Sequence, residues 1–179
     1  MVVLVEGESD LVALHTLARC AGRDLGEEGV LVVAMGGITN IRAHALWFGP
    51  RGLGVTLRGL YDAPDESWVR RGLAAAGIAV PDGDLAAIGF QRCTDDLEDE
   101  LIRAVGVERV ERVVQAEGEL RSLDLLAGMP AQQGWSREAL LHRFIGVRSG
   151  RKARYARLLV EAVGPDGAPA PLLALAGRP

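Results

Sequence analysis

The amino-acid sequence predicts an α/β protein: a parallel sheet of about four strands flanked by helices, with a helical C-terminal section. Over the first ninety residues, short apolar segments alternate with segments whose apolar residues recur at helical spacing. The connections between them are short, and such an alternation gives right-handed crossovers and a parallel sheet. From about Asp95 onward, only helical patterns follow.

Four short apolar runs indicate the strands, because strands covered on both faces read as nearly continuous hydrophobic segments. We expect them at residues 2–5, 30–34, 55–61 and 86–90. The third run is less uniformly apolar than the others.

Helices are expected between and after these runs. Ser9 is a suitable N-cap for the first helix, and Thr39 or Asn40 for the second, which Gly49 ends. Ser136 is expected to cap a later helix. The full set is predicted at about residues 9–22, 40–48, 65–77, 97–105, 107–114, 137–144 and 150–163.

This pattern predicts three parts of the chain. Residues 1–105 form an α/β core, and residues 106–163 form a helical section packed on that core. Residues 164–179 contain four prolines and are expected to wrap the surface or fray.

Composition narrows the class of protein. With 49% hydrophobic and 25% charged residues, the chain is not disordered as a whole. No apolar run approaches the ~18 residues that a membrane span needs, so no membrane association is expected. The chain opens on a strand-like run, which predicts no secretory signal peptide, and its two cysteines suit a reducing cytoplasm.

Charge is unevenly distributed along the chain. The formal net charge of −4 argues against binding nucleic acid by bulk charge, but residues 137–157 are strongly basic whereas the segment up to Glu66 is acidic. Lys152 is the sole lysine among 20 basic residues. It is therefore a candidate for chemistry that needs a compact point charge, the alternative being chance survival on a solvated face.

Carboxylates follow the predicted strands closely. Glu6 comes directly after the first strand and Asp62 ends the third, so neighbouring strands would bring both to one crevice. Asp10 lies in the first turn of the next helix, and residues 95–100 form a dense acidic run. Acids at helix N-termini also complement the helix dipole, which explains part of this pattern. Closely spaced carboxylates otherwise favour a hard cation such as Mg²⁺ or Mn²⁺.

Residues 4–10 (LVEGESD), the acids beginning at Asp62, and residues 95–101 (DDLEDEL) together resemble the TOPRIM domain. The form is that of OLD-family (overcoming lysogenization defect) nucleases, and specifically of short actinobacterial proteins described as TOPRIM nucleotidyl transferase/hydrolase domain-containing. The similarity extends to residues 148–156 (RSGRKARYA) and covers nearly the whole chain.

The resemblance implies a TOPRIM-like Rossmannoid sheet and divalent-metal-dependent phosphoryl transfer, with a DNA endonuclease or nickase as the expected activity. Glu6 and Lys152 would be catalytic, and Arg148, Arg151 and Arg154 would contact DNA. Mg²⁺ or Mn²⁺ would be held by a set of acids. Those acids are Glu6, Asp10, Asp62, Asp65, Glu66, Asp96 and Glu98.

The third-strand motif departs from the family pattern. An Asp-x-Asp pair needs an acid two residues after Asp62, but Pro64 stands there, and Asp65 and Glu66 follow it in a different register. A catalytically degenerate module that binds nucleic acid, nucleotide or a partner without turnover is therefore the alternative. The sequence also lacks a phosphate-binding loop, so an ATPase partner would be a separate chain.

The remaining polar and aromatic residues suggest no site. His15 is expected to be packed in a helix, and His44 and His142 have no ligand partner at metal-binding spacing. We expect the three tryptophans, Trp47, Trp68 and Trp135, to pack in the core or between helices rather than stack on bases.

Overall fold

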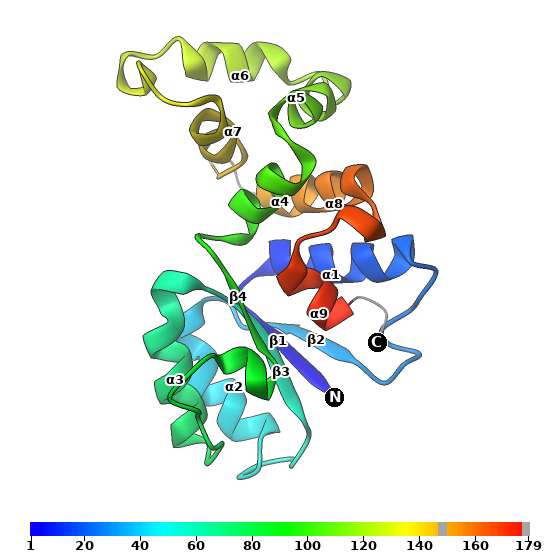
Figure 1. Cartoon of the computed structure of the whole chain (residues 1–179), viewed down its shortest axis with the longest axis vertical. Coiled ribbons are helices and arrows are strands. Elements are labelled where there is room, and N and C mark those ends of the chain that lie inside the picture. Colours follow the sequence, from blue (N-terminus) through cyan, green and yellow to red (C-terminus); the bar gives the residue numbers. More distant parts are fainter. Residues whose placement is uncertain (147–149, 177–179) are drawn as a thin grey trace.

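The computed structural model describes residues 1–146 and 150–176 of the chain. Four parallel strands form one sheet in the order β2-β1-β3-β4 (Figure 1). The strands are β1 (Val2–Val5), β2 (Leu31–Ala34), β3 (Leu57–Asp62) and β4 (Phe90–Cys93). Helices flank this sheet, so the predicted fold class is confirmed.

The strand order places the carboxyl ends of β1 and β3 side by side. β1 pairs with β2 on one edge and with β3 on the other, with Leu4 opposite Gly59. The chain therefore reverses its direction of progress across the sheet between these two central strands. Such a switch point opens a crevice at the carboxyl ends of the strands, where ligands bind in open α/β sheets.

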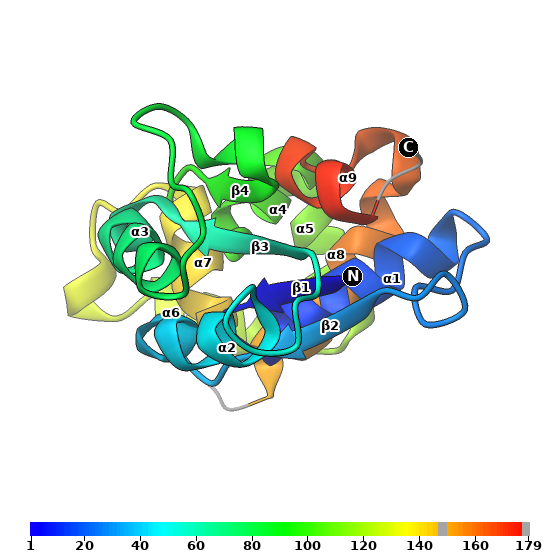
Figure 2. The ribbon, with the colours of Figure 1, turned by 90° about the horizontal axis from the view of Figure 1, so that it is seen from below.

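Alternate residues of β1 pack into two different hydrophobic cores, one on each face of the sheet. Val2 and Leu4 pack with α2 (Ile41–Phe48) and α3 (Glu66–Ala75), whereas Val3 and Val5 pack with α1 (Glu8–Cys20) and α8 (Arg151–Val163). Figure 2 shows these helix pairs on opposite sides of the strands. The period-two alternation of a strand explains why the whole run is apolar, since both of its faces are covered.

α5 (Val107–Ala116), α6 (Leu120–Ala127) and α7 (Arg137–Gly146) form the part of the molecule farthest from the strands (Figure 1). α4 (Leu97–Val105) follows β4 and contacts α7 and α8. Ser136 accepts a hydrogen bond from the Ala139 N–H at 3.2 Å, as expected of an N-cap. α6 was not expected as a separate helix. No helix among the described residues is long and apolar enough to cross a membrane.

Two expected elements differ in the structure. The fourth strand begins four residues later than the apolar run, because residues 85–88 form a 3₁₀ turn that Gly89 ends with a φ of 87°. The described part of the C-terminal segment does not fray: residues 170–176 form α9, in which Leu172 and Ala176 are fully buried. α9 packs against α1 and β4, so its leucines complete the core rather than wrapping the surface.

Gly59 allows the close approach of β3 and β4. A Cβ at this position would lie 2.7 Å from the Phe90 ring and 2.9 Å from the Leu4 carbonyl oxygen. We expect Gly59→Ala to lower the free energy of unfolding by about 1–3 kcal/mol, because a closely packed interior must shift to admit the methyl group. Urea unfolding measures this loss. Gly83→Ala is the control, since nothing lies within 4 Å of a Cβ there, and equal effects at both positions would contradict the packing argument.

Candidate metal and phosphate site

A cavity of about 510 Å³ lies at the carboxyl ends of β1 and β3. The first turns of α1, α4 and α8 complete its wall. Lys152 lines it, and so do five carboxylates: Glu6, Glu8, Asp10, Asp62 and Glu98. The crevice expected from the order of acids and strands is therefore present, and Glu6 and Asp62 share it.

Glu6, Asp62 and Asp65 form one group of possible metal ligands, called here the Glu6 cluster. One carboxylate oxygen from each lies within 4.8 Å of the other two. Asp65 reaches this position because Ala63–Asp65 form a 3₁₀ turn with Pro64 near its start, where a missing N–H costs no hydrogen bond. Pro64 thus shifts the second acid of the motif by one position along the chain.

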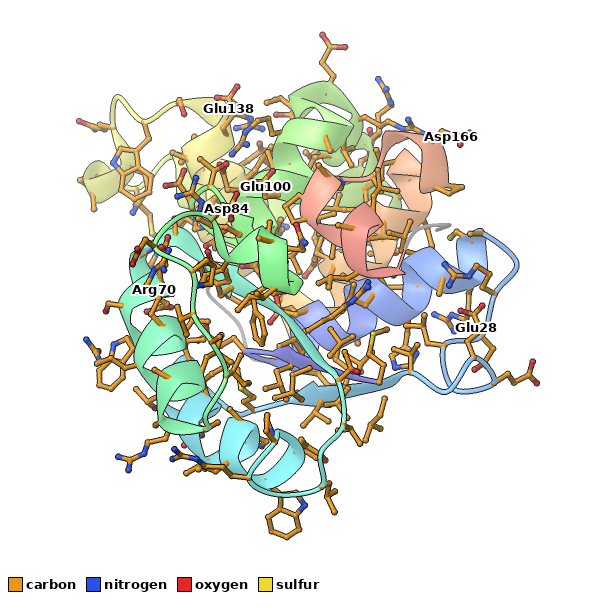
Figure 3. The ribbon with its side chains drawn as sticks, turned by 60° about the horizontal axis from the view of Figure 1, so that its bottom comes forward. Glu28, Arg70, Asp84, Glu100, Glu138 and Asp166 are labelled. Carbon is orange, nitrogen blue, oxygen red and sulfur yellow. The ribbon has the colours of Figure 1, made fainter. Side chains whose placement is uncertain are left out.

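Glu66 does not join the Glu6 cluster. Its carboxylate pairs with Arg70, four residues later on α3, and lies 3.8 Å from a guanidinium nitrogen of Arg92. Arg70, labelled in Figure 3, also donates to the carbonyl oxygens of Pro81 and Gly83. These partners give Glu66 a structural role at the start of α3.

Asp10 lines the cavity and is buried, with 8% of the residue exposed. Its Oδ2 accepts a hydrogen bond from the Gly7 N–H at 2.8 Å, which closes the first turn of α1. Burial raises the pKa of Asp10 from 3.8 to about 7, although the Gly7 hydrogen bond opposes this shift. A buried carboxylate with a raised pKa is ionised at neutral pH only at a cost in free energy.

The pKa values of the two acids at the strand ends are raised for the same reason. Burial and then the nearby charges of Asp10, Asp96 and Glu6 raise the pKa of Asp62 to about 8. Burial and then Asp65 raise the pKa of Glu6. Like charges gathered in a half-buried crevice repel one another, and a bound cation removes that repulsion.

A second group of possible ligands consists of Asp96, Glu98 and His142, called here the His142 cluster. Their ligand atoms also lie within 4.8 Å of one another. Asp96 caps α4 by accepting the Asp99 N–H at 2.9 Å through Oδ1, and its Oδ2 lies 2.6 Å from His142 Nε2. Burial opposes ionisation of Asp96, but the hydrogen bonds outweigh it and lower its pKa. The same contact raises the pKa of His142.

Glu98 has an unsatisfied oxygen. The residue is 5% exposed, its Oε2 accepts a hydrogen bond from Lys152 Nζ at 3.1 Å, and its buried Oε1 has no hydrogen-bond partner among the described residues. Burial lowers the pKa of Lys152, but the Glu98 charge outweighs this and leaves the pKa raised, so the lysine stays charged. A buried carboxylate oxygen without a partner fits a hard cation, which would supply the missing contact.

The arginines expected to contact DNA have different surroundings. Arg148 lies outside the described residues. The Arg151 guanidinium is buried, with Glu119 Oε1 at 2.9 Å and the Phe144 carbonyl oxygen at 2.8 Å. Its charge is paired with that of Glu119 inside the protein, which corrects the expectation that Arg151 faces a ligand. Arg154 is partly exposed and pairs with Glu117 and Glu119.

His142 is the site residue that the sequence did not indicate. It is 46 residues from Asp96, and no short motif joins the two. The expectation that the tryptophans are packed inside was wrong as well. Trp47 is 69% exposed, Trp68 45% and Trp135 43%. The aromatic residues that fill the core are instead Tyr61, Phe90, Phe144 and Tyr155.

Comparison with known proteins shows which family the chain resembles. Residues 1–63 match the family model for the TOPRIM domain of overcoming lysogenization defect-like proteins. The whole chain resembles the C-terminal region of the Xanthomonas campestris pv. campestris OLD protein, with 26% identity and a TM-score of 0.66 over 97% of this chain and 90% of that one. The C-terminal region of the Burkholderia pseudomallei OLD protein shares the fold, with 22% identity and a TM-score of 0.66 over 97% and 92%.

A search of functionally curated protein sequences gave no significant match. The family match covers β1, β2, β3 and the first acids of the site, and the structural likeness extends over 97% of the chain. The resemblance drawn from the motifs is thereby confirmed: residues 1–63 match the TOPRIM domain of OLD-like proteins, and the fold of the chain is that of the C-terminal region of OLD proteins.

Proposed function

We propose that this protein is a divalent-metal-dependent phosphodiester hydrolase that acts on DNA as an endonuclease or nickase. The proposal rests on one observation: several carboxylates and the ammonium group of Lys152 line the same cavity. Carboxylates bind hard cations, and the cations together with a lysine balance the charge of a reacting phosphodiester.

The Glu6 cluster supplies oxygen ligands suited to Mg²⁺ or Mn²⁺, with Asp10 behind it. A divalent cation held by these carboxylates would polarise phosphoryl oxygens and would help to ionise water. Glu98 holds the Lys152 ammonium at the cavity, where its charge stabilises the extra negative charge that develops on the phosphoryl group. The first turns of α1 and α8 also line the cavity, and helix N-termini favour anions.

DNA is the proposed substrate, and the basic residues around the start of α8 are the proposed contacts. Arg154 and Arg148 remain in that set, whereas the buried partners of Arg151 remove it. We further propose that any ATPase partner is a separate chain. Reduced Cys20 and Cys93 suit a protein that works in the cytoplasm.

Supercoiled plasmid tests the activity directly. We expect nicked product with Mg²⁺ or Mn²⁺ and none with EDTA, and we expect Lys152→Ala to slow nicking at least about tenfold. Arg157→Ala is the matched control, because this partly exposed arginine on α8 pairs only with Glu161 among the described residues. Metal-independent nicking would contradict the mechanism, and DNA binding without product would favour a non-catalytic module.

Two variants at neighbouring positions test whether Asp65 is a metal ligand. We expect Asp65→Asn to weaken Mg²⁺ binding at least about tenfold, because Asp65 is one of the three converging carboxylates. Glu66→Gln should leave Mg²⁺ affinity nearly unchanged, since Glu66 faces Arg70 and Arg92. Titration calorimetry measures both. The reverse order of effects would show that Glu66 is the ligand.

A further inference from the structure

The His142 cluster differs chemically from the Glu6 cluster. The Glu6 cluster offers only carboxylate oxygens, whereas the His142 cluster adds an imidazole nitrogen. His142 belongs to α7 in the helical section and lies far outside the 63 residues that match the family model. The packing of α7 on α4 brings its ring to the acids that follow β4.

We propose that His142 is a metal ligand that completes a cation site with Asp96 and Glu98, and that this site prefers Mn²⁺ to Mg²⁺. The proposal rests on the proposed function only for the part that this cation plays in the reaction. Binding of the cation is a separate property, which can be measured without DNA.

Each of the three side chains is already held in position. Asp96 is fixed by the Asp99 N–H on Oδ1, which leaves Oδ2 facing His142. Glu98 is fixed by Lys152 on Oε2, which leaves Oε1 buried and without a partner among the described residues. The unsatisfied Oε1 points to a missing ligand, because a buried carboxylate oxygen without a partner is costly.

The nitrogen donor sets the metal preference. Mg²⁺ takes oxygen ligands in a strict octahedron and keeps several waters, whereas the transition-metal ion Mn²⁺ binds carboxylates and also accepts a nitrogen ligand. A mixed set of two carboxylates and one imidazole therefore favours Mn²⁺ over Mg²⁺. The all-oxygen Glu6 cluster accepts either ion.

A purely structural role for His142 makes a different prediction. In that case its contact with Asp96 only fastens α7 to α4, and removing the ring changes stability without changing metal binding. The two roles are separated by a measurement that detects nitrogen bound to the metal.

Pulsed electron paramagnetic resonance of Mn²⁺ on the full-length protein is that measurement. We expect ¹⁴N couplings from a coordinated imidazole in the wild type and their loss in His142→Gln, which keeps a hydrogen-bond donor for Asp96. His44→Gln is the control, because His44 lies on α2 and contacts the Asn40 carbonyl oxygen. Competition between Mn²⁺ and Mg²⁺ should show the preference for Mn²⁺ falling about tenfold in His142→Gln.

Bound Mn²⁺ without nitrogen couplings would overturn the proposal, as would couplings that persist in His142→Gln. Glu6→Gln keeps the couplings if the two clusters are separate sites. Plasmid nicking distinguishes this proposal from the proposed function. Nicking without couplings removes the His142 site alone, and couplings without nicking remove the nuclease alone.

Discussion

Glu6→Gln is expected to slow metal-dependent nicking about a thousandfold. The substitution keeps the size of the side chain but removes one of the charges that converge on the carboxyl ends of β1 and β3. A loss of about 4 kcal/mol of electrostatic stabilisation at a reacting phosphoryl group corresponds to this factor. Single-turnover cleavage of supercoiled plasmid at saturating Mn²⁺ measures the chemical step.

Glu138→Gln is the control for removal of one acid. Glu138 is exposed on α7 (Figure 3) and is not part of the cavity wall. The Glu138→Gln variant should nick plasmid at the wild-type rate, and circular dichroism should show that the Glu6→Gln and Glu138→Gln variants are both folded. A Glu6 variant that is folded and fully active would remove Glu6 from the mechanism.

The α/β core was predictable because the apolar pattern of a buried strand is contained in a few consecutive residues. Residues 2–5 are apolar throughout because both faces of β1 are covered, and that pattern is visible without coordinates. The position of Glu6 beside Asp62 then follows from a general property of parallel sheets: the carboxyl ends of neighbouring strands lie at one edge.

Contacts set by helix packing were not predictable. His142 meets Asp96 only because α7 packs on α4, and Arg151 is buried only because Glu119 lies beneath it. Neither pairing has a short sequence signature. α9 was missed for the same reason, since its leucines become a helix face only against α1. Asp65 was an open alternative because the sequence does not show how sharply the chain turns at Pro64.

Without divalent cations, the protein should lose stability as the pH rises from about 4 to 8. An unfolded aspartate loses its proton near pH 4, whereas Asp10 and Asp62 keep theirs until about pH 7 and 8 in the folded state. The folded state binds more protons across this window, so the free energy of unfolding falls with rising pH, by on the order of a few kcal/mol. Thermal melts in EDTA from pH 5.5 to 8.5 measure the fall.

Mg²⁺ or Mn²⁺ should reverse this loss, and more strongly at pH 8.5 than at pH 5.5. A cation binds the ionised carboxylates, so its stabilising effect grows as protons leave the crevice. Asp10→Asn should flatten the pH dependence in EDTA, because the amide oxygen can still accept the Gly7 N–H while the buried charge is gone. Asp166→Asn, at an exposed position (Figure 3), should behave as wild type. A melting temperature that rises with pH in EDTA, or a metal effect equal at both pH values, would mean that these carboxylates are not the cation site.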